Sequence, residues 1–171
     1  MNALSDTQAD AALTDTVEEL TGFASDGNQY LTFRLLDEEY GVEILRVQEI
    51  KNLSHITPIP NTPSFIKGAM NLRGTVVPII DLRTKFSMPP GEYNQYTVII
   101  VVTIGTRVMG LVVDAVSDVL NVGSEDYEPA PSFGGDVDTS FMTGLAKSGD
   151  RLITLLNIDK LVGLADISQS N

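Results

Sequence analysis

The 171-residue chain contains no cysteine and a single histidine, and it has only 11 basic residues against 23 acidic ones. Without cysteine the chain has no disulfide framework, no thiolate nucleophile and no cysteine-rich zinc site. The net charge of -12 has the wrong sign for neutralising nucleic-acid phosphates or binding an anionic membrane surface. We therefore expect no nucleic-acid partner and no binding to lipid headgroups.

Long apolar runs are also absent. The longest, Val98 to Val102, is far shorter than the roughly 20 residues of a membrane-spanning helix and is typical of a buried strand. The N-terminus has no basic start, and Asp6, Asp10 and Asp15 interrupt its apolar residues, which is unlike a secretory signal. These absences favour a cytoplasmic protein without direct membrane insertion.

The first 28 residues differ in composition from the rest. They carry six acidic residues and no basic one, which is half of the net charge. This composition predicts a flexible, solvated tail over residues 1–28, followed by one domain over residues 29–171. Leu13, Val17 and Leu20 recur at helical spacing, so a short docked helix is the alternative for part of the tail.

From Tyr30 onward the chain consists of short runs rich in Val, Ile and Thr, separated by turn residues, which predicts an all-β fold. Short helices are expected only where Asp81 and Asn157 can cap them, with a brief helical turn between Ile44 and Ile50. The predicted strands are 30–36, 39–44, 67–72, 75–80, 97–103, 108–113, 142–146 and 151–156, and the predicted helices are 81–86 and 157–165.

An internal repeat organises these elements. Residues 68–82 align with 144–158 at one constant offset, which places Gly68 on Gly144 and Asp81 on Asn157. Upstream, residues 40–50 resemble 109–119, and the order of the motifs is the same. A duplication producing two small β-barrels of about five strands each is the simplest explanation, because closure removes exposed sheet edges, and chance similarity between apolar strands is the alternative. The extra length of the second half falls in 124–138 and predicts a variable loop.

No catalytic or metal site emerges from the sequence. His55 lies in a polar connection, and no Gly-x-Ser-x-Gly nucleophile motif accompanies it. The acidic pairs Glu38-Glu39 and Glu125-Asp126 lie in predicted turns and lack the spacing of a calcium loop. We therefore expect neither an enzyme nor a bound metal or cofactor.

Several residues have both a structural and a functional interpretation. Gly41, Gly68, Gly74 and Gly110 interrupt apolar strands, which is typical of bulges or close backbone approaches. Arg73 stands at a predicted hairpin tip, where it either contacts a partner's carboxylate or caps a local carbonyl.

Taken together, several motifs resemble the CheW-like domain family of chemotaxis coupling proteins, over roughly residues 30–164. The motifs are Glu39-Tyr-Gly-Val-Glu-Ile-Leu-Arg-Val-Gln-Glu-Ile50, Pro63-Ser-Phe-Ile-Lys-Gly68, Asn71-Leu-Arg-Gly74, Val77-Pro-Ile-Ile-Asp-Leu82, Gly110-Leu-Val-Val-Asp-Ala-Val-Ser-Asp-Val119 and Thr143-Gly-Leu145. The resemblance implies two SH3-like five-stranded barrels and a scaffold without catalytic activity or cofactor.

The resemblance also implies partners and contact residues. Proteins of this family connect the cytoplasmic tips of methyl-accepting chemoreceptors to the regulatory domain of the histidine kinase CheA, in membrane-associated arrays. The kinase-binding positions that carry over are Val119 and Phe133. The receptor-binding positions that carry over are Val47, Glu49, Arg73, Val98, Gly68 and Gly110.

Two alternatives from other functional classes stay open at this point. A two-barrel domain that binds a small ligand between its barrels requires a deep apolar pocket with converging polar groups. A hydrolase that uses His55 requires a nucleophile beside that residue.

Overall fold

The computed structural model describes residues 28–129 and 141–161. Phe133 and, except for Asn28, the predicted tail lie outside these residues, so the tail and the domain boundary stay predictions. The described strands are β1 (Asn28–Leu35), β2 (Glu38–Glu43), β3 (Val47–Asn52), β4 (Ile66–Leu72), β5 (Thr75–Asp81), β6 (Val98–Ile104), β7 (Arg107–Val113), β8 (Ala115–Val122), β9 (Tyr127–Pro129), β10 (Met142–Ser148) and β11 (Arg151–Leu156). The helices are α3 (Leu82–Lys85), α4 (Ile158–Leu161) and the 3-10 turns Ile44–Arg46 and Ser124–Asp126.

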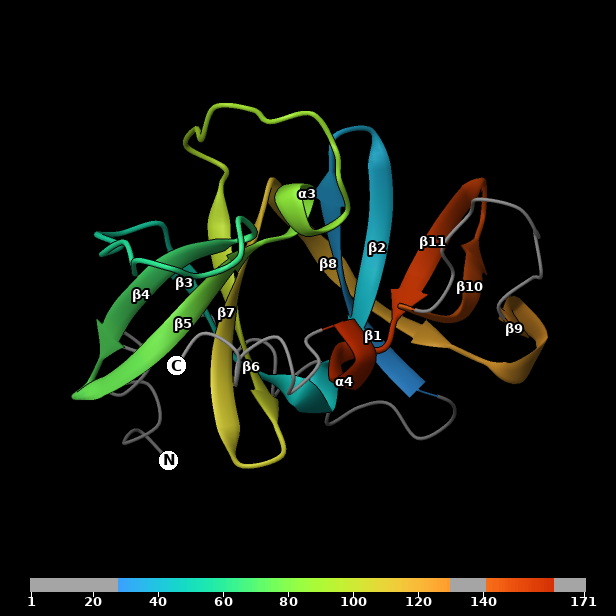
Figure 1. Ribbon diagram of the computed structural model, residues 1–171. Helices are drawn as coiled ribbons and strands as arrows, with labels where there is room; N and C mark the ends of the chain where they lie inside the picture. Colours follow the sequence, from blue (N-terminus) through green and yellow to red (C-terminus); the bar gives the residue numbers. More distant parts are fainter. Residues whose placement is uncertain (1–27, 130–140, 162–171) are drawn as a thin grey trace, which may run out of the picture.

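The strands form two sheets that lie side by side (Figure 1). The six-stranded sheet has the order β8-β1-β2-β11-β10-β9, and the five-stranded sheet has the order β3-β6-β7-β5-β4. The predicted all-β class with two strand units is confirmed, although the six-stranded sheet contains one strand more than the five expected. Hydrogen-bonded closure of each sheet into a barrel stays a prediction.

All eight predicted strands are present, whereas β3, β8 and β9 were missed. The predicted helical turn covers only Ile44–Arg46, and strand β3 starts directly after it, which corrects the prediction for the rest of that segment. In β3 and β8 most side chains are half-buried or exposed, so their apolar residues do not form a continuous run. Short, half-buried edge strands of this kind leave a weak signal in the sequence.

Both predicted helix caps are confirmed. The Asp81 carboxylate accepts hydrogen bonds from the backbone N–H groups of Arg83 and Thr84 at the start of α3. The side-chain oxygen of Asn157 accepts one from Lys160 N at 3.1 Å, at the start of α4. These caps satisfy donors that have no partner within the helix.

The internal repeat is visible in the strand register. Gly68 lies opposite Ile79 in the β4–β5 hairpin, and Gly144 lies opposite Leu155 in the β10–β11 hairpin. In each sheet the second strand of this hairpin pairs in parallel with a strand of the other repeat: Ile79 pairs with Gly110, and Leu155 pairs with Gly41. Each sheet therefore combines strands from both halves of the chain.

This exchange of strands between the two halves of the chain produces three hydrophobic clusters. The largest joins side chains of both sheets, such as Leu31 and Phe33 of β1 with Ile100 and Val102 of β6, and we call it the inter-sheet core. A second cluster belongs to the five-stranded sheet and a third to the six-stranded sheet. Because the neighbouring residues of β6 alternate between the inter-sheet core and the second cluster, this strand is buried on both faces. The uninterrupted apolar run from Val98 to Val102 follows from that position.

Candidate partner-binding surface

The predicted hairpin tip at Arg73 is present, and its backbone is unusual. Arg73 and Gly74 join β4 to β5 with φ angles of 51° and 89°. Two consecutive left-handed residues between antiparallel strands define a type I′ turn, whose twist matches that of the strands. The Asn71 side-chain oxygen accepts a hydrogen bond from Gly74 N at 2.8 Å within this turn.

The Arg73 guanidinium donates a hydrogen bond to the Glu49 carboxylate of β3. The acceptor is a carboxylate of the same chain, 24 residues away, so the observed contact differs from both interpretations of Arg73, and binding of a partner stays a prediction. The Arg73 side chain is 62% exposed and that of Glu49 is 15% exposed. Glu49 raises the pKa of Arg73, first through the hydrogen bond and then through its charge. The pair presents a fixed positive group to the solvent.

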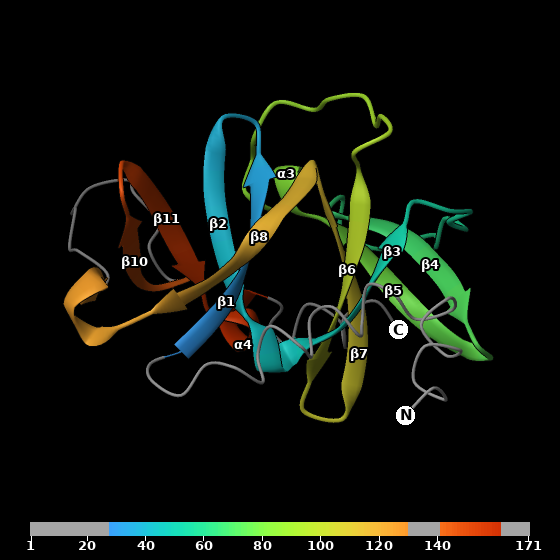
Figure 2. The same cartoon turned by 180° about the vertical axis from the view of Figure 1, so that it is seen from behind.

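Three valines of the candidate site lie at the margin of the inter-sheet core. Val47 on β3, Val98 on β6 and Val119 on β8 are half-buried and pack against it. Figure 2 shows β3, β6 and β8 on the face opposite to helices α3 and α4. Val47 and Val98 therefore lie on the paired strands β3 and β6 of the five-stranded sheet, and Val119 lies on β8, which pairs with β1 of the six-stranded sheet.

The two glycines of the predicted receptor site are buried and fill packing positions. A Cβ atom on Gly68 would lie 2.1 Å from the carbonyl oxygen of Thr57. A Cβ atom on Gly110 would lie 2.6 Å from Ile79 Cδ1 and 2.8 Å from Ile99 Cγ2. Both residues permit close approaches inside the five-stranded sheet, so any effect on a surface is indirect.

A charged network that the sequence interpretation missed lies in the six-stranded sheet. Arg151 Nη2 donates to Glu39 Oε1 at 2.5 Å and to Asp118 Oδ1 at 3.1 Å. The buried Thr32 hydroxyl donates to the same Asp118 oxygen at 2.5 Å. The repeat that aligns residues 40–50 with 109–119 places Asp118 at the position of Glu49, which is the signal that points to this network.

A cavity of about 490 Å³ lies between α3 and strands β2 and β11. Its lining is Tyr40, Lys85, Phe86, Ser87, Met88, Phe141, Met142, Thr154 and Leu156. The Lys85 ammonium lies 4.0 Å from the centre of the Phe65 ring, and the Tyr40 hydroxyl donates to Glu38. Burial raises the pKa of Tyr40, so its hydroxyl stays protonated. This cavity is one place in the described fold for the small-ligand alternative, beside another of about 460 Å³ between Tyr30, Arg46 and Tyr127.

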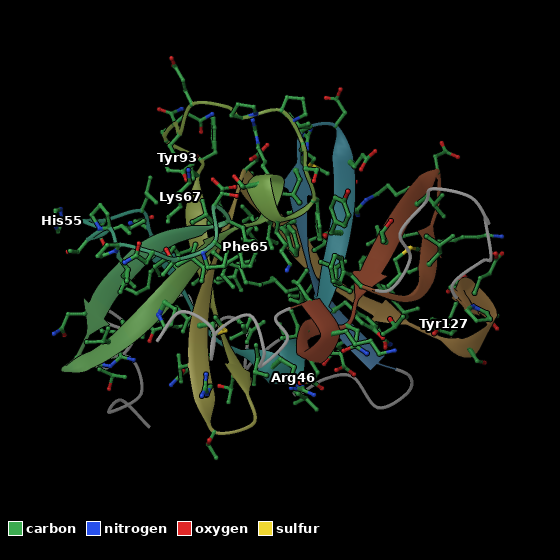
Figure 3. The ribbon with its side chains drawn as sticks, in the orientation of Figure 1. Arg46, His55, Phe65, Lys67, Tyr93 and Tyr127 are labelled. Carbon is green, nitrogen blue, oxygen red and sulfur yellow. The ribbon has the colours of Figure 1, made fainter. Side chains whose placement is uncertain are left out.

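The other chemical possibilities gain no support. His55 is exposed and lies at the periphery of the molecule, away from the other labelled residues (Figure 3). Within residues 28–129 and 141–161, no group of three His, Asp or Glu side chains is arranged to hold a metal ion. None of the described helices is long and apolar enough to cross a membrane.

Comparison with known proteins agrees with this architecture. Residues 29–166 match the family model of the CheW-like domain. The chain is 47% identical over 153 residues to a Chemotaxis protein CheW from Klebsiella aerogenes, covering 90% of this chain and 92% of that one. It is 37% identical over 149 residues to a Chemotaxis protein CheW from Rhizobium meliloti, with coverages of 87% and 94%.

Among solved structures, the scaffolding protein TtCheW from Thermoanaerobacter tengcongensis superimposes with a TM-score of 0.75 at 35% identity, covering 82% of this chain and 95% of that one. The chain belongs to the CheW-like domain family. The predicted role as a coupling adaptor in chemotaxis is thereby confirmed.

Proposed function

We propose that the chain is a non-catalytic adaptor that binds the helical tips of methyl-accepting chemoreceptors and the regulatory domain of the histidine kinase CheA. The receptor contacts the Glu49–Arg73 pair together with Val47 and Val98. The kinase contacts Val119 and Phe133. The protein acts in the cytoplasm and is recruited to receptor arrays at the membrane.

The observation that carries this proposal is the exposed Arg73 guanidinium, held by the Glu49 carboxylate on β3, the strand whose Val47 packs against the margin of the inter-sheet core. A helix that docks on a protein surface needs apolar side chains to cover and a few charges to set its orientation. Val47 and Val98 supply apolar surface continuous with the inter-sheet core. Arg73 supplies the charge, with guanidinium donors besides the one that Glu49 accepts.

The proposal is tested by co-sedimentation of the purified protein with chemoreceptor-containing membranes, with and without CheA. Arg73→Glu is expected to lower recruitment at least tenfold, because it places two carboxylates against each other and removes the donor group. Arg107→Glu is the matched control, since Arg107 is also an exposed arginine at a hairpin end of the five-stranded sheet. This control is expected to bind as the wild type does.

An exchange of the two charges separates a partner contact from an internal one. The double variant Arg73→Glu with Glu49→Arg restores an ion pair but reverses its direction. Continued loss of recruitment with a normal melting temperature supports a direct contact with the receptor. Recovery of recruitment would show that the pair acts only inside the fold. Wild-type protein that fails to sediment under any condition would overturn the proposal and leave the cavity beside Tyr40 as the next site to test.

A further inference from the structure

The backbone at Arg73 is the observation that leads beyond the contact itself. A left-handed conformation is unfavourable for a residue with a long side chain, and such positions are usually occupied by Gly, Asn or Asp. The repeat alignment that places Gly68 on Gly144 places Arg73 on Gly149. Gly149 is also left-handed, with a φ of 62°. The same turn position therefore carries glycine in the six-stranded sheet and arginine in the five-stranded sheet.

Available space does not explain this difference. A Cβ atom on Gly149 would meet no other atom within 4 Å, so the glycine there answers a requirement of the backbone alone. Arg73 adopts the same left-handed backbone conformation although it has a Cβ atom, which costs conformational energy. Strained residues of this type persist where the side chain has a function and the surroundings hold the backbone in place.

The surroundings that hold the Arg73 backbone are visible. The buried Leu72 anchors the hairpin in the second hydrophobic cluster. Gly74 occupies the second left-handed position, and its N–H donates to the Asn71 side-chain oxygen at 2.8 Å. Asn71 itself is exposed and lies at the end of β4, so its side chain contributes little to burial.

We infer that Asn71 is a positioning residue for Arg73: its side-chain oxygen holds the Arg73–Gly74 turn in the left-handed form that directs the guanidinium to Glu49 and to the partner. This inference rests on the proposed function, because it assigns to Asn71 a role at the same surface. With the turn relaxed, Arg73 is still present but samples other directions. Partner binding then weakens without removal of any charge.

Three variants test the inference in the co-sedimentation experiment, each accompanied by a melting temperature. Asn71→Ala removes the acceptor and is expected to weaken recruitment about fivefold, the effect of one neutral hydrogen bond. Asn71→Asp keeps an acceptor oxygen at the same place and is expected to restore recruitment. Gly74→Ala is expected to weaken recruitment through the backbone alone, because its Cβ would meet nothing within 4 Å.

Two control variants make the same kinds of substitution at other places in the chain. Asn94→Ala removes a side-chain oxygen that accepts a hydrogen bond from Tyr96 N at 2.7 Å in another exposed loop. Gly149→Ala places a Cβ atom at the left-handed position of the other hairpin. Both are expected to change the melting temperature as much as their counterparts do while leaving recruitment normal. In an Arg73→Ala background, Asn71→Ala is expected to cause no further loss, because it acts through Arg73.

The outcomes separate the inference from the function on which it rests. Normal recruitment of Asn71→Ala and Gly74→Ala, with loss in Arg73→Glu, would refute the positioning role and keep the proposed surface. Equal losses in Asn71→Ala and Asn94→Ala would show a general effect of stability and would also refute it. Normal recruitment of Arg73→Glu would remove the proposed surface and the role of Asn71 together.

Discussion

In the five-stranded sheet Glu49 is paired with Arg73 at a hairpin tip, whereas in the six-stranded sheet Asp118, at the same position of the repeat, is paired with Arg151 at the start of β11. The Arg73 side chain is 62% exposed, and Glu49 is its ion-pair partner. The Arg151 side chain is 33% exposed and is shared between Asp118 and Glu39.

This difference shows how a duplicated framework acquires two uses. Both sheets keep a carboxylate at the same place on an edge strand, and both pair it with an arginine from a hairpin far along the chain. Arg151 is enclosed by two carboxylates, one of which also accepts from Thr32, so its donors are directed inward. Arg73 keeps most of its surface in solvent. The first arrangement joins side chains of three strands, and the second leaves a charged group exposed to solvent, which the proposed function assigns to a partner.

The largest effect is expected at the glycines that the repeat places in both sheets. In Gly68→Ala the Cβ atom would lie 2.1 Å from Thr57 O, and the φ of 150° adds backbone strain. We expect a loss of about 4 kcal/mol of unfolding free energy from the clash and the strain together. In Gly144→Ala the nearest atom is Glu128 O at 2.4 Å without that φ, so the loss is expected to be smaller.

Urea unfolding of the two variants measures this order, with Gly123→Ala as the control. A Cβ atom on Gly123 would meet nothing within 4 Å, so this variant is expected to stay close to the wild type. A larger loss of unfolding free energy in Gly144→Ala than in Gly68→Ala would contradict the expected order.

A moderate effect is expected from the two arginines. Arg151→Ala leaves Glu39 and Asp118 without their shared partner and is expected to cost about 1 kcal/mol of stability, after allowance for solvent screening. Arg73→Ala leaves one carboxylate, Glu49, without its partner instead of two, so it is expected to cost less stability than Arg151→Ala while it lowers recruitment to receptor membranes. Differential scanning calorimetry together with co-sedimentation checks both statements. Equal destabilisation by the two substitutions would contradict the division into a structural and an exposed arginine.

The smallest effect is a pH dependence specific to the six-stranded sheet. The hydrogen bond from Arg151, assisted by that from Thr32, holds the pKa of Asp118 below its ordinary value of 3.8. A carboxylate whose pKa is lower in the folded state contributes stability above the unfolded pKa and loses this contribution as the pH falls through the folded pKa. The stability difference between the wild type and Asp118→Asn is therefore expected to be constant between about pH 7 and pH 5 and to shrink below about pH 4.

Urea denaturation at stepped pH measures this difference, with Asp37→Asn in the exposed β1–β2 turn as the control. A difference that stays constant down to about pH 2 would show that Asp118 does not contribute through its ionised form.

Several features of the fold were predictable because they depend on neighbours in the chain. Asp81 and Asn157 cap helices through backbone groups two or three residues away. The unbroken apolar run of β6 indicated a buried strand, and the repeat indicated two similar units. Of the candidate site, the hairpin tip at Arg73 followed from Gly74 and the flanking strands.

Other features depend on contacts between distant segments, which local patterns do not contain. Strand β8 was missed because most of its side chains are half-buried or exposed, so its apolar residues form no continuous run. Val47 of the five-stranded sheet and Val119 of the six-stranded sheet both pack against the inter-sheet core, which their separate sequence motifs did not show. Asn71 attracted attention only as part of a motif, because its role depends on the φ angles of the turn.

The sequence by itself determined the all-β class, the duplicated order of motifs, the helix caps and the family to which the chain belongs. The first three follow from composition, periodicity and short-range hydrogen bonds, and the family follows from the resemblance of the motifs. Tertiary structure alone decided that each sheet takes strands from both repeats, and that Arg73 meets Glu49 while Arg151 meets Asp118 and Glu39. The physical reason is that parallel pairing of β5 with β7 and of β11 with β2 joins segments that are far apart in the chain. Burial of these strands in the inter-sheet core then determines which charged side chains lie close enough to form ion pairs.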